Sequence, residues 1–283
     1  MVKLQIPEFG LLSEEDWSFF LDFDPEQYIL TIDESLRLYN RFFVDNRFNK
    51  LLNYYTTNEK AIKEFEFIIP EHKELYRARI YDCLDAEEKA KNAKDGKFNG
   101  YNKEDSFVPP SNIHCRQGRI NPDGIIYLYL SSTAECAIQE VTPAPSNWVS
   151  VAKIVFLESV RIFDMAKSCL TGVFSDKKKS NWAMKIMSSL SSLFSRPYRE
   201  VGDYLICQYV SEFIKNTGYD GIRFFSSRVL QKFNEESYVN YTIFNYNNKC
   251  EPISSDLLYV FNNNLEILTY EKKESITYNG EVE

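Results

Sequence analysis

The pattern of hydrophobic and polar positions predicts a helical beginning to the chain. In residues 33–55 apolar side chains recur every three to four positions, which predicts a helix with Asp33 as its N-cap. A second capped helix is predicted over residues 56–69, and Pro70 closes it. We therefore expect residues 1–70 to form a small helical domain.

After residue 70 the pattern changes to short strands that are separated by helices. Residues 74–83 alternate as in a strand, with Arg77 and Arg79 on one face. Residues 124–131 are apolar and β-rich, and they run into a short helix over 134–141.

Further elements are predicted in the second half of the chain. They are one or two strands in 149–165, a helix from near Asn181, a helix in 201–227 that ends at Gly218, and a strand over 240–246. Because the strands do not alternate regularly with helices, the fold class is predicted to be α+β. We expect the second domain to cover residues 71–265 and a C-terminal tail to follow over 266–283.

One long polar stretch interrupts this domain. Residues 84–112 contain two glycines and a Pro-Pro pair, with one short helix predicted at 85–93. Long loops in compact domains are usually functional or disordered. This stretch is either a lid over a site or a simple mobile insertion.

Composition and charge exclude several classes of protein. The net charge of −8 argues against a broad nucleic-acid-binding surface. The six cysteines form no CxxC pair, the chain starts without the apolar core of a signal peptide, and no apolar run approaches the roughly 20 residues of a membrane span. We expect a cytoplasmic protein with reduced cysteines and no membrane segment. With only two histidines and no metal-binding spacing, no metal is expected.

A turn with an arginine precedes the strand at 124–131. Arg119 lies between Gly118 and the sequence NPDG, which ends at Gly124. Glycines permit a close approach of the backbone to a ligand, and NPDG favours a tight turn. The turn either holds Arg119 for an anionic ligand or is an ordinary hairpin with a surface arginine.

The strand and the helix after it carry further polar candidates. Tyr127 and Tyr129 point the same way on the strand and are either ring-stacking residues or core tyrosines. Thr133 is a suitable N-cap for the helix, and Glu140 lies on the flank of its apolar stripe. There a carboxylate either faces a cavity or is solvated.

Together these pieces resemble the RES-domain family, which is named for an arginine, a glutamate and a serine. The matching stretches are LYRAR at 75–79, GRINPDGIIYLYLSSTAECAIQEV at 118–141, GYDGIRFFSS at 218–227 and NYTIF at 240–244. The resemblance implies an ADP-ribosyltransferase-like fold, here with an N-terminal helical extension similar to those of some longer members.

The resemblance also implies the site. It places the family's arginine on Arg77, with Arg79 as the alternative, the tyrosine on Tyr129 and the glutamate on Glu140. It further places the serine on Ser226, or on Ser227 in the other register. Arg119 matches the arginine of the glycine-flanked turn, and Tyr127 is a further substrate-binding candidate.

The activity implied by the resemblance is that of a toxin that consumes NAD⁺, without a metal. The expected reaction is cleavage of the nicotinamide–ribose bond, with water, phosphate or a protein as acceptor. An Xre-type antitoxin is the expected partner, and a homodimer is favoured. The alternative functions are ADP-ribosylation of a protein target and a non-catalytic ligand- or partner-binding module.

Overall fold

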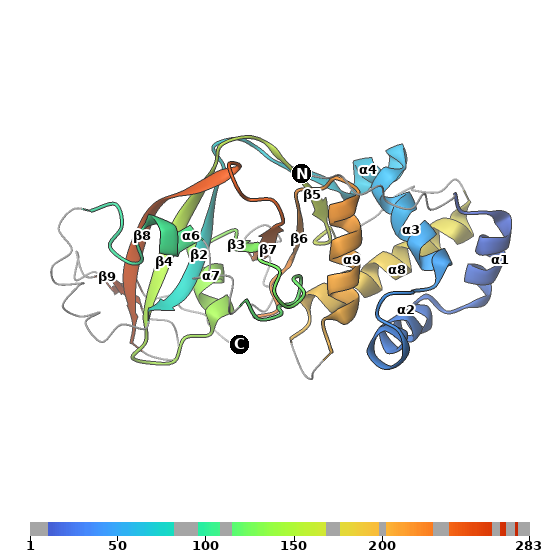
Figure 1. Ribbon diagram of the computed structural model, residues 1–283, viewed down its shortest axis with the longest axis horizontal. Helices are drawn as coiled ribbons and strands as arrows, with labels where there is room; N and C mark the ends of the chain where they lie inside the picture. Colours follow the sequence, from blue (N-terminus) through green and yellow to red (C-terminus); the bar gives the residue numbers. More distant parts are fainter. Residues whose placement is uncertain are drawn as a thin grey trace. The chain divides into compact units, whose positions relative to one another are not determined.

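A computed structural model describes the larger part of the chain. The described residues are 11–81, 96–107, 115–167, 176–197, 202–228, 238–261, 267–269 and 275–276. The helix predicted at 85–93 and most of the predicted tail at 266–283 lie outside them. The fold contains both helices and a mixed β-sheet, so the predicted α+β class is confirmed (Figure 1).

Two compact units make up the fold, and each is built from several stretches of chain. Unit 1 contains 1–68, 116–125 and 161–225. Unit 2 contains 69–115, 126–160 and 226–283. The first stretch of unit 1 ends close to the predicted boundary at residue 70, but this unit also takes in segments from the middle of the chain. The predicted division into domains stays a prediction.

Unit 1 is mainly helical. Its elements are α1 (Glu14–Asp22), α2 (Pro25–Glu34), the π-helix η1 (Ser35–Tyr39), α3 (Asn46–Thr57), α4 (Glu59–Phe65), β1 (Glu66–Ile69), β5 (Val160–Asp164), α8 (Lys177–Ser195), α9 (Leu205–Asn216) and β6 (Gly221–Phe225). Strands β5 and β6 are parallel neighbours. In the core, Trp182 of α8 stacks on Phe20 of α1, with ring centroids 4.6 Å apart.

The single helix predicted over 33–55 is wrong, because the chain turns at Asn40. The Asn40 side chain accepts hydrogen bonds from the backbone N–H groups of Phe42 and Phe43, an arrangement that competes with a continuing helix. Asp33 is not a cap but lies inside α2, where it pairs with Arg37 at 2.8 Å. The cap of the next helix is Asp45, which accepts from the N–H of Arg47.

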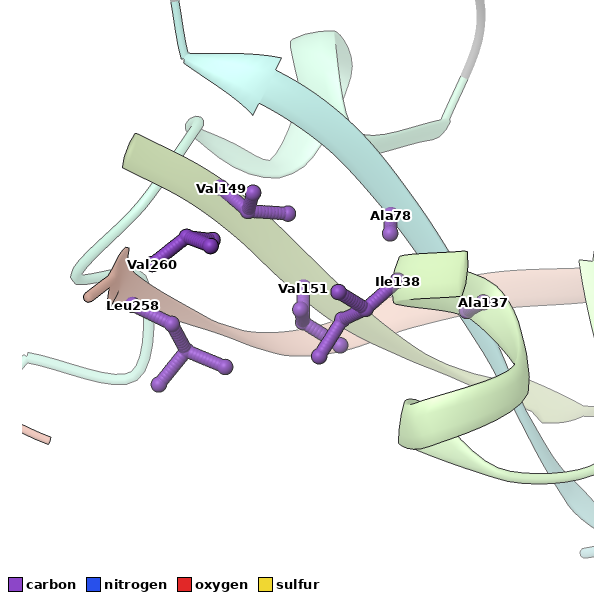
Figure 2. Packing of buried hydrophobic residues seen from close by; sticks show 7 residues of the cluster. All are labelled: Ala78, Ala137, Ile138, Val149, Val151, Leu258 and Val260. Atoms are coloured by element: carbon purple, nitrogen blue, oxygen red, sulfur yellow. The ribbon is translucent and has the colours of Figure 1, made fainter. Parts of the chain in front are cut away.

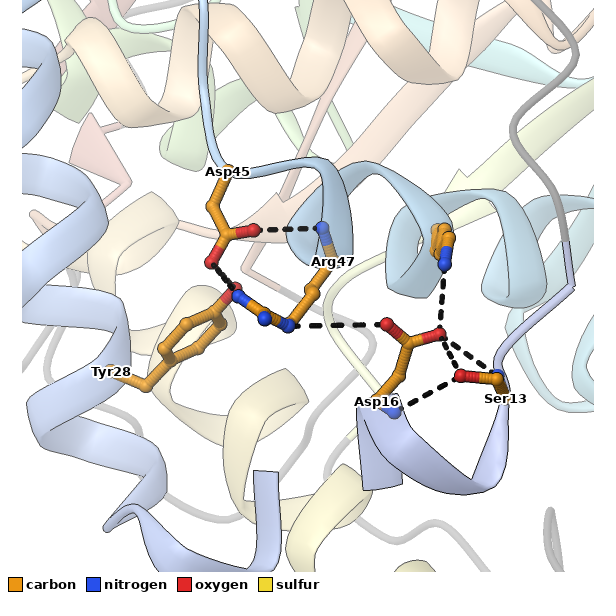
Figure 3. Close-up of polar contacts among 6 residues, drawn as sticks. Ser13, Asp16, Tyr28, Asp45 and Arg47 are labelled. Atoms are coloured by element: carbon orange, nitrogen blue, oxygen red, sulfur yellow. Dashed lines mark hydrogen bonds and ion pairs between the residues drawn. The ribbon is translucent and has the colours of Figure 1, made fainter. Parts of the chain in front are cut away.

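Polar side chains join the first three helices of unit 1 (Figure 3). Ser13 and Asp16 form a capping box at the start of α1. Lys50 of α3 donates to Asp16 at 2.9 Å, and the Tyr28 hydroxyl of α2 donates to Asp45 at 3.4 Å. The carboxylates that cap the helices therefore also hold neighbouring helices together.

Unit 2 contains an antiparallel sheet. Its elements are β2 (Glu74–Tyr81), α6 (Lys103–Phe107), β3 (Leu128–Ser131), α7 (Ala134–Val141), β4 (Trp148–Phe156), β7 (Val239–Ile243), β8 (Cys250–Val260), β9 (Ile267–Thr269) and β10 (Ser275–Ile276), and the strand order is β7-β3-β2-β4-β8-β9-β10. Strand β2 pairs with β4 along its whole length, from Glu74–Val155 to Tyr81–Trp148. With β3, in contrast, it has one paired position in the described residues, Tyr76–Ser131.

Helix α7 packs on one face of this sheet. The predicted cap is confirmed, since the Thr133 side chain accepts from the N–H of Cys136 at 3.1 Å. Figure 2 shows the apolar cluster beneath the helix. It consists of Ala78, Ala137, Ile138, Val149, Val151, Leu258 and Val260. Because Ala78 faces α7, the neighbouring Arg77 and Arg79 point to the opposite face of β2, as strand alternation requires.

The cluster beneath α7 predicts a large cost for truncating Ile138, which is 2% exposed. Ile138→Ala should lower the free energy of unfolding by about 2–5 kcal/mol, and the matched Ile138→Val by about 0.5–1.5 kcal/mol. Urea denaturation measures both. Equal, small losses for the two variants would contradict the packing of α7 on the sheet.

Candidate active site

The carboxylate of Glu140 is held by side chains from two distant segments of unit 2. Ser226 Oγ donates a hydrogen bond to Glu140 Oε1 at 2.5 Å, and Asn240 Nδ2 donates to the same oxygen at 2.7 Å. Glu140 is half-buried near the C-terminal end of α7. Two donors on one oxygen fix the orientation of the carboxylate and point Oε2 away from both of them. Oε2 can therefore still accept a hydrogen bond from a ligand.

The serine of this pair is itself oriented by the backbone. The N–H of Arg228 donates to Ser226 Oγ at 3.1 Å, and the N–H of Ser226 donates to the carbonyl of Tyr238 at 3.0 Å. Ser226 Oγ thus accepts one hydrogen bond while it donates another to Glu140. The hydrogen bond to Glu140 makes Ser226 the first candidate of the two registers, and the choice between Ser226 and Ser227 stays a prediction.

Asn240 and Ser131 complete the network, and sequence reasoning missed both. They are cross-strand partners on β7 and β3, and Ser131 Oγ donates to Asn240 Oδ1 at 2.8 Å. The carboxylate of Glu140 assigns the amide, because it can only accept: Nδ2 must face Glu140, and Oδ1 is left to accept from Ser131. The available signal was Asn240 itself, a polar residue at the start of the strand predicted over 240–246.

Tyr129 and Arg77 lie on the two strands beside this network. Tyr129 is two residues before Ser131 on β3, so its half-buried side chain is on the same face of the strand. Arg77 Nη1 donates to the backbone carbonyl of Tyr129 at 3.3 Å. The Arg77 side chain therefore contacts the backbone of Tyr129 where β2 and β3 share the one pair Tyr76–Ser131, while the Tyr129 side chain lies on the α7 side of the sheet.

Arg77 lowers the stability of the fold in this position. Burial and then the charge of Arg79 lower the pKa of Arg77 to about 10. Its Nε is buried and has no hydrogen-bond partner among the described residues. A buried donor without a partner destabilises the fold, and an anionic ligand would satisfy it.

Arg79 is engaged in the fold. Its Nη1 donates to the backbone carbonyl of Asp105 at 2.5 Å, and its guanidinium lies over the Tyr101 ring at 4.5 Å from the centroid. Arg77 and Arg79 share a face of β2, but Arg77 has the donor that a ligand could use. Arg77 is therefore the first candidate of the two arginines, and the choice between them stays a prediction.

The predicted residues Arg119 and Tyr127 are packed against other groups of the protein. Arg119 belongs to unit 1, where it donates to the carbonyl of Phe194 and lies near the rings of Tyr204 and Phe224. Tyr127 is buried, and its ring meets Phe244 edge-on with centroids 4.9 Å apart. These contacts are those of a packed arginine and a core tyrosine, and a part in substrate binding stays a prediction for both.

The described residues contain no group of three His, Cys, Asp or Glu side chains that could hold a metal ion. They also contain no helix whose length and apolar character would let it cross a membrane.

The different surroundings of the two arginines predict opposite effects on stability. Arg77→Met removes a half-buried charge whose Nε has no hydrogen-bond partner among the described residues, and should raise the free energy of unfolding by about 1 kcal/mol. Arg79→Met loses the Asp105 contact and the Tyr101 ring and should lower it by about 1–2 kcal/mol. Urea denaturation at neutral pH is suitable, because the cost of the Arg77 charge is present in full below its lowered pKa of about 10. A loss of stability in Arg77→Met would contradict this description of the site.

Comparison with known proteins agrees with the geometry. The family model of the RES domain matches residues 96–260, which is more than half of the chain. Tyr129, Glu140, Ser226 and Asn240 lie inside the matched residues, whereas Arg77 precedes them. No curated protein matches the chain significantly. Because one family model covers most of the sheet and the whole Glu140 network, the chain belongs to the RES-domain family.

Proposed function

We propose that the chain is an enzyme that cleaves the nicotinamide–ribose bond of NAD⁺, by hydrolysis or phosphorolysis. The RES domain is a toxin-like domain connected with NAD. The observation that carries the proposal is the Glu140 carboxylate, fixed on one oxygen by Ser226 and Asn240. An oriented, half-buried carboxylate is suited to stabilise positive charge that develops at a sugar carbon.

In the proposed reaction the bond from the ribose carbon to the nicotinamide nitrogen breaks, and its electron pair stays on that nitrogen. Nicotinamide leaves as a neutral molecule, so no strong general acid is needed. The ribose becomes oxocarbenium-like and is stabilised by Glu140. Water then adds its oxygen to this carbon and loses a proton, which gives ADP-ribose, whereas inorganic phosphate gives ADP-ribose 1″-phosphate.

The remaining residues would bind and orient the substrate. Arg77 has a buried donor for the diphosphate, in keeping with the preference of guanidinium groups for phosphate oxygens. Tyr129, on the Ser131 face of β3, would orient the nicotinamide ring. Ser226 would act mainly by holding Glu140, and Arg119 and Tyr127 remain candidates for substrate contact.

Several finer points belong to the same proposal. The Xre-type antitoxin, the homodimer and the cytoplasmic location follow from the family resemblance and the sequence. The described cysteines Cys136, Cys207 and Cys250 form no disulfide with another described residue, which supports a reducing compartment. Transfer of ADP-ribose to a protein is the second candidate reaction, since the same cation could be captured by a protein side chain.

The role of Glu140 predicts a large loss of activity when its charge is removed. Purified protein should release nicotinamide from NAD⁺, and Glu140→Gln should reduce kcat by about 10²-fold or more, because Gln keeps the shape but lacks the negative charge. Glu135→Gln is the matched control, with the same change on the same helix, and should remain active. Chromatography of nicotinamide measures the rates. Equal rates for Glu140→Gln and the wild type would refute the assignment, and NAD⁺ binding without turnover in the wild type would indicate a binding module.

The hydrogen bond from Ser226 predicts a difference between the two adjacent serines. Ser226→Ala should lower kcat about tenfold, since it removes one of two hydrogen bonds to a charged group. Ser227→Ala should change kcat less than about twofold. The same nicotinamide assay tests both, and the reverse order of effects would place the serine in the other register.

Product analysis separates the acceptors. We expect ADP-ribose in phosphate-free buffer and, for a phosphorylase, ADP-ribose 1″-phosphate when phosphate is added, as resolved by mass spectrometry. Radiolabel that appears only on protein would instead support the transferase.

A further inference from the structure

The buried thiol of Cys136 contacts the side chain that holds Glu140. Cys136 lies one helical turn before Glu140 on α7, so the two side chains share one side of the helix. Cys136 Sγ donates to Asn240 Oδ1 at 3.6 Å, while Asn240 Nδ2 donates to Glu140 Oε1 at 2.7 Å. Helix α7 therefore contacts the amide group of Asn240 at both ends, once through a thiol and once through a carboxylate.

The amide oxygen of Asn240 has a second donor, which comes from strand β3. Ser131 Oγ donates to Oδ1 at 2.8 Å, so this oxygen accepts from both Ser131 and Cys136. An amide oxygen has two lone pairs and can accept two hydrogen bonds. A rotation that turned Oδ1 towards Glu140 would break both contacts and bring two acceptor oxygens together. Ser131 and Cys136 therefore hold Asn240 with its NH₂ group towards the carboxylate.

The surroundings of Cys136 keep its thiol a donor. Cys136 is 0% exposed and Asn240 is 6% exposed, so bulk water competes little for the hydrogen bond between them. Burial raises the pKa of Cys136 to about 11, although hydrogen bonds with Ser131 and Ser226 lower it. The thiol is therefore protonated at neutral pH, and it lies among the same side chains that surround the Glu140 carboxylate.

A buried cysteine usually acts as a small apolar residue of the core. If Cys136 had only that function, its replacement by alanine would affect stability and leave the chemistry at Glu140 unchanged. The contact with Asn240 Oδ1 gives the thiol a second function, because alanine cannot donate a hydrogen bond, whereas serine can. The two interpretations therefore predict different orders of activity for the alanine and serine variants.

We propose that Cys136 is a positioning residue for Glu140: together with Ser131 it fixes the amide of Asn240, and this amide in turn orients the carboxylate. The inference rests on the proposed function for the reaction that Glu140 serves. Cys136 acts only through Asn240 and does not touch the substrate. It therefore contributes to the rate of bond cleavage and not to the binding of NAD⁺.

Two substitutions of Cys136 separate this role from core packing. Cys136→Ala removes the donor and should lower kcat for nicotinamide release by about threefold to tenfold, the scale for loss of one hydrogen bond, with KM for NAD⁺ within about twofold. Cys136→Ser keeps a donor and should have a kcat within about twofold of the wild type, although a hydroxyl suits an apolar core less well than a thiol. A kcat that falls as much in Cys136→Ser as in Cys136→Ala, or in neither, would overturn the proposal.

A double-mutant cycle tests whether Cys136 acts through Asn240. In the Asn240→Leu protein, Cys136→Ala should lower kcat no further, because the group that it positions is already absent. Thr242→Val is the matched control on the same face of β7, where the Thr242 hydroxyl has no hydrogen-bond partner among the described residues, and it should leave kcat within about twofold. Effects of Cys136→Ala and Asn240→Leu that multiply would contradict the proposal.

The infrared S–H stretching band of Cys136, isolated as the difference between the wild-type and Cys136→Ala spectra, tests the contact without any reaction. A hydrogen-bonded thiol absorbs at lower frequency than a free one, so Asn240→Leu should shift the band to higher frequency and Thr242→Val should leave it in place. That shift would support the contact even if the wild type released no nicotinamide, in which case the proposed function alone would fail. If the wild type cleaves NAD⁺ and the band does not move, the positioning role is refuted and the proposed function stands. Should Asn240→Leu not fold, the comparison of Cys136→Ala with Cys136→Ser decides.

Discussion

The site depends on the way in which the Glu140 carboxylate is fixed. Its Oε1 accepts from Ser226, which follows β6, and from Asn240, on β7, while Glu140 itself lies near the end of α7. These segments are far apart in the chain, so the arrangement forms only when strand β7 pairs with β3 and α7 packs on the sheet. The stability of that packing is therefore also the condition for any chemistry at Glu140.

A second constraint is the cost of Arg77. Its side chain is half-buried, its pKa is lowered to about 10, and its Nε has no hydrogen-bond partner among the described residues. A residue chosen for stability alone would be apolar at this position. The guanidinium of the nearby Arg79, in contrast, is stabilised by a backbone carbonyl and an aromatic ring. Unfavourable arrangements of this kind are typical of sites that bind a ligand.

Local signals made much of the fold predictable. The cap at Thr133, the helix after it and the alternation on β2 depend on neighbours in sequence, and all three agree with the structure. The helix predicted over 33–55 failed because the Asn40 side chain captures the next backbone N–H groups, and periodicity does not register such a competition. Strand β8 was not predicted either, although it pairs along β4.

The site was predictable to a smaller extent. Residue types and family resemblance singled out Glu140 and Ser226, and the structure brings these two together. Asn240 escaped notice because its role depends on Ser131, more than one hundred residues away in the chain. The choice between Arg77 and Arg79 likewise needs tertiary contacts, since both lie on one face of the same strand and only their surroundings differ.

A crystal structure of the Glu140→Gln variant with NAD⁺ would test the central claim most directly. The account predicts that the anomeric carbon of the nicotinamide ribose faces the side chain at position 140, with the diphosphate within hydrogen-bond distance of Arg77. A dinucleotide bound away from the Ser226–Asn240 network, or with its diphosphate out of reach of Arg77, would contradict it.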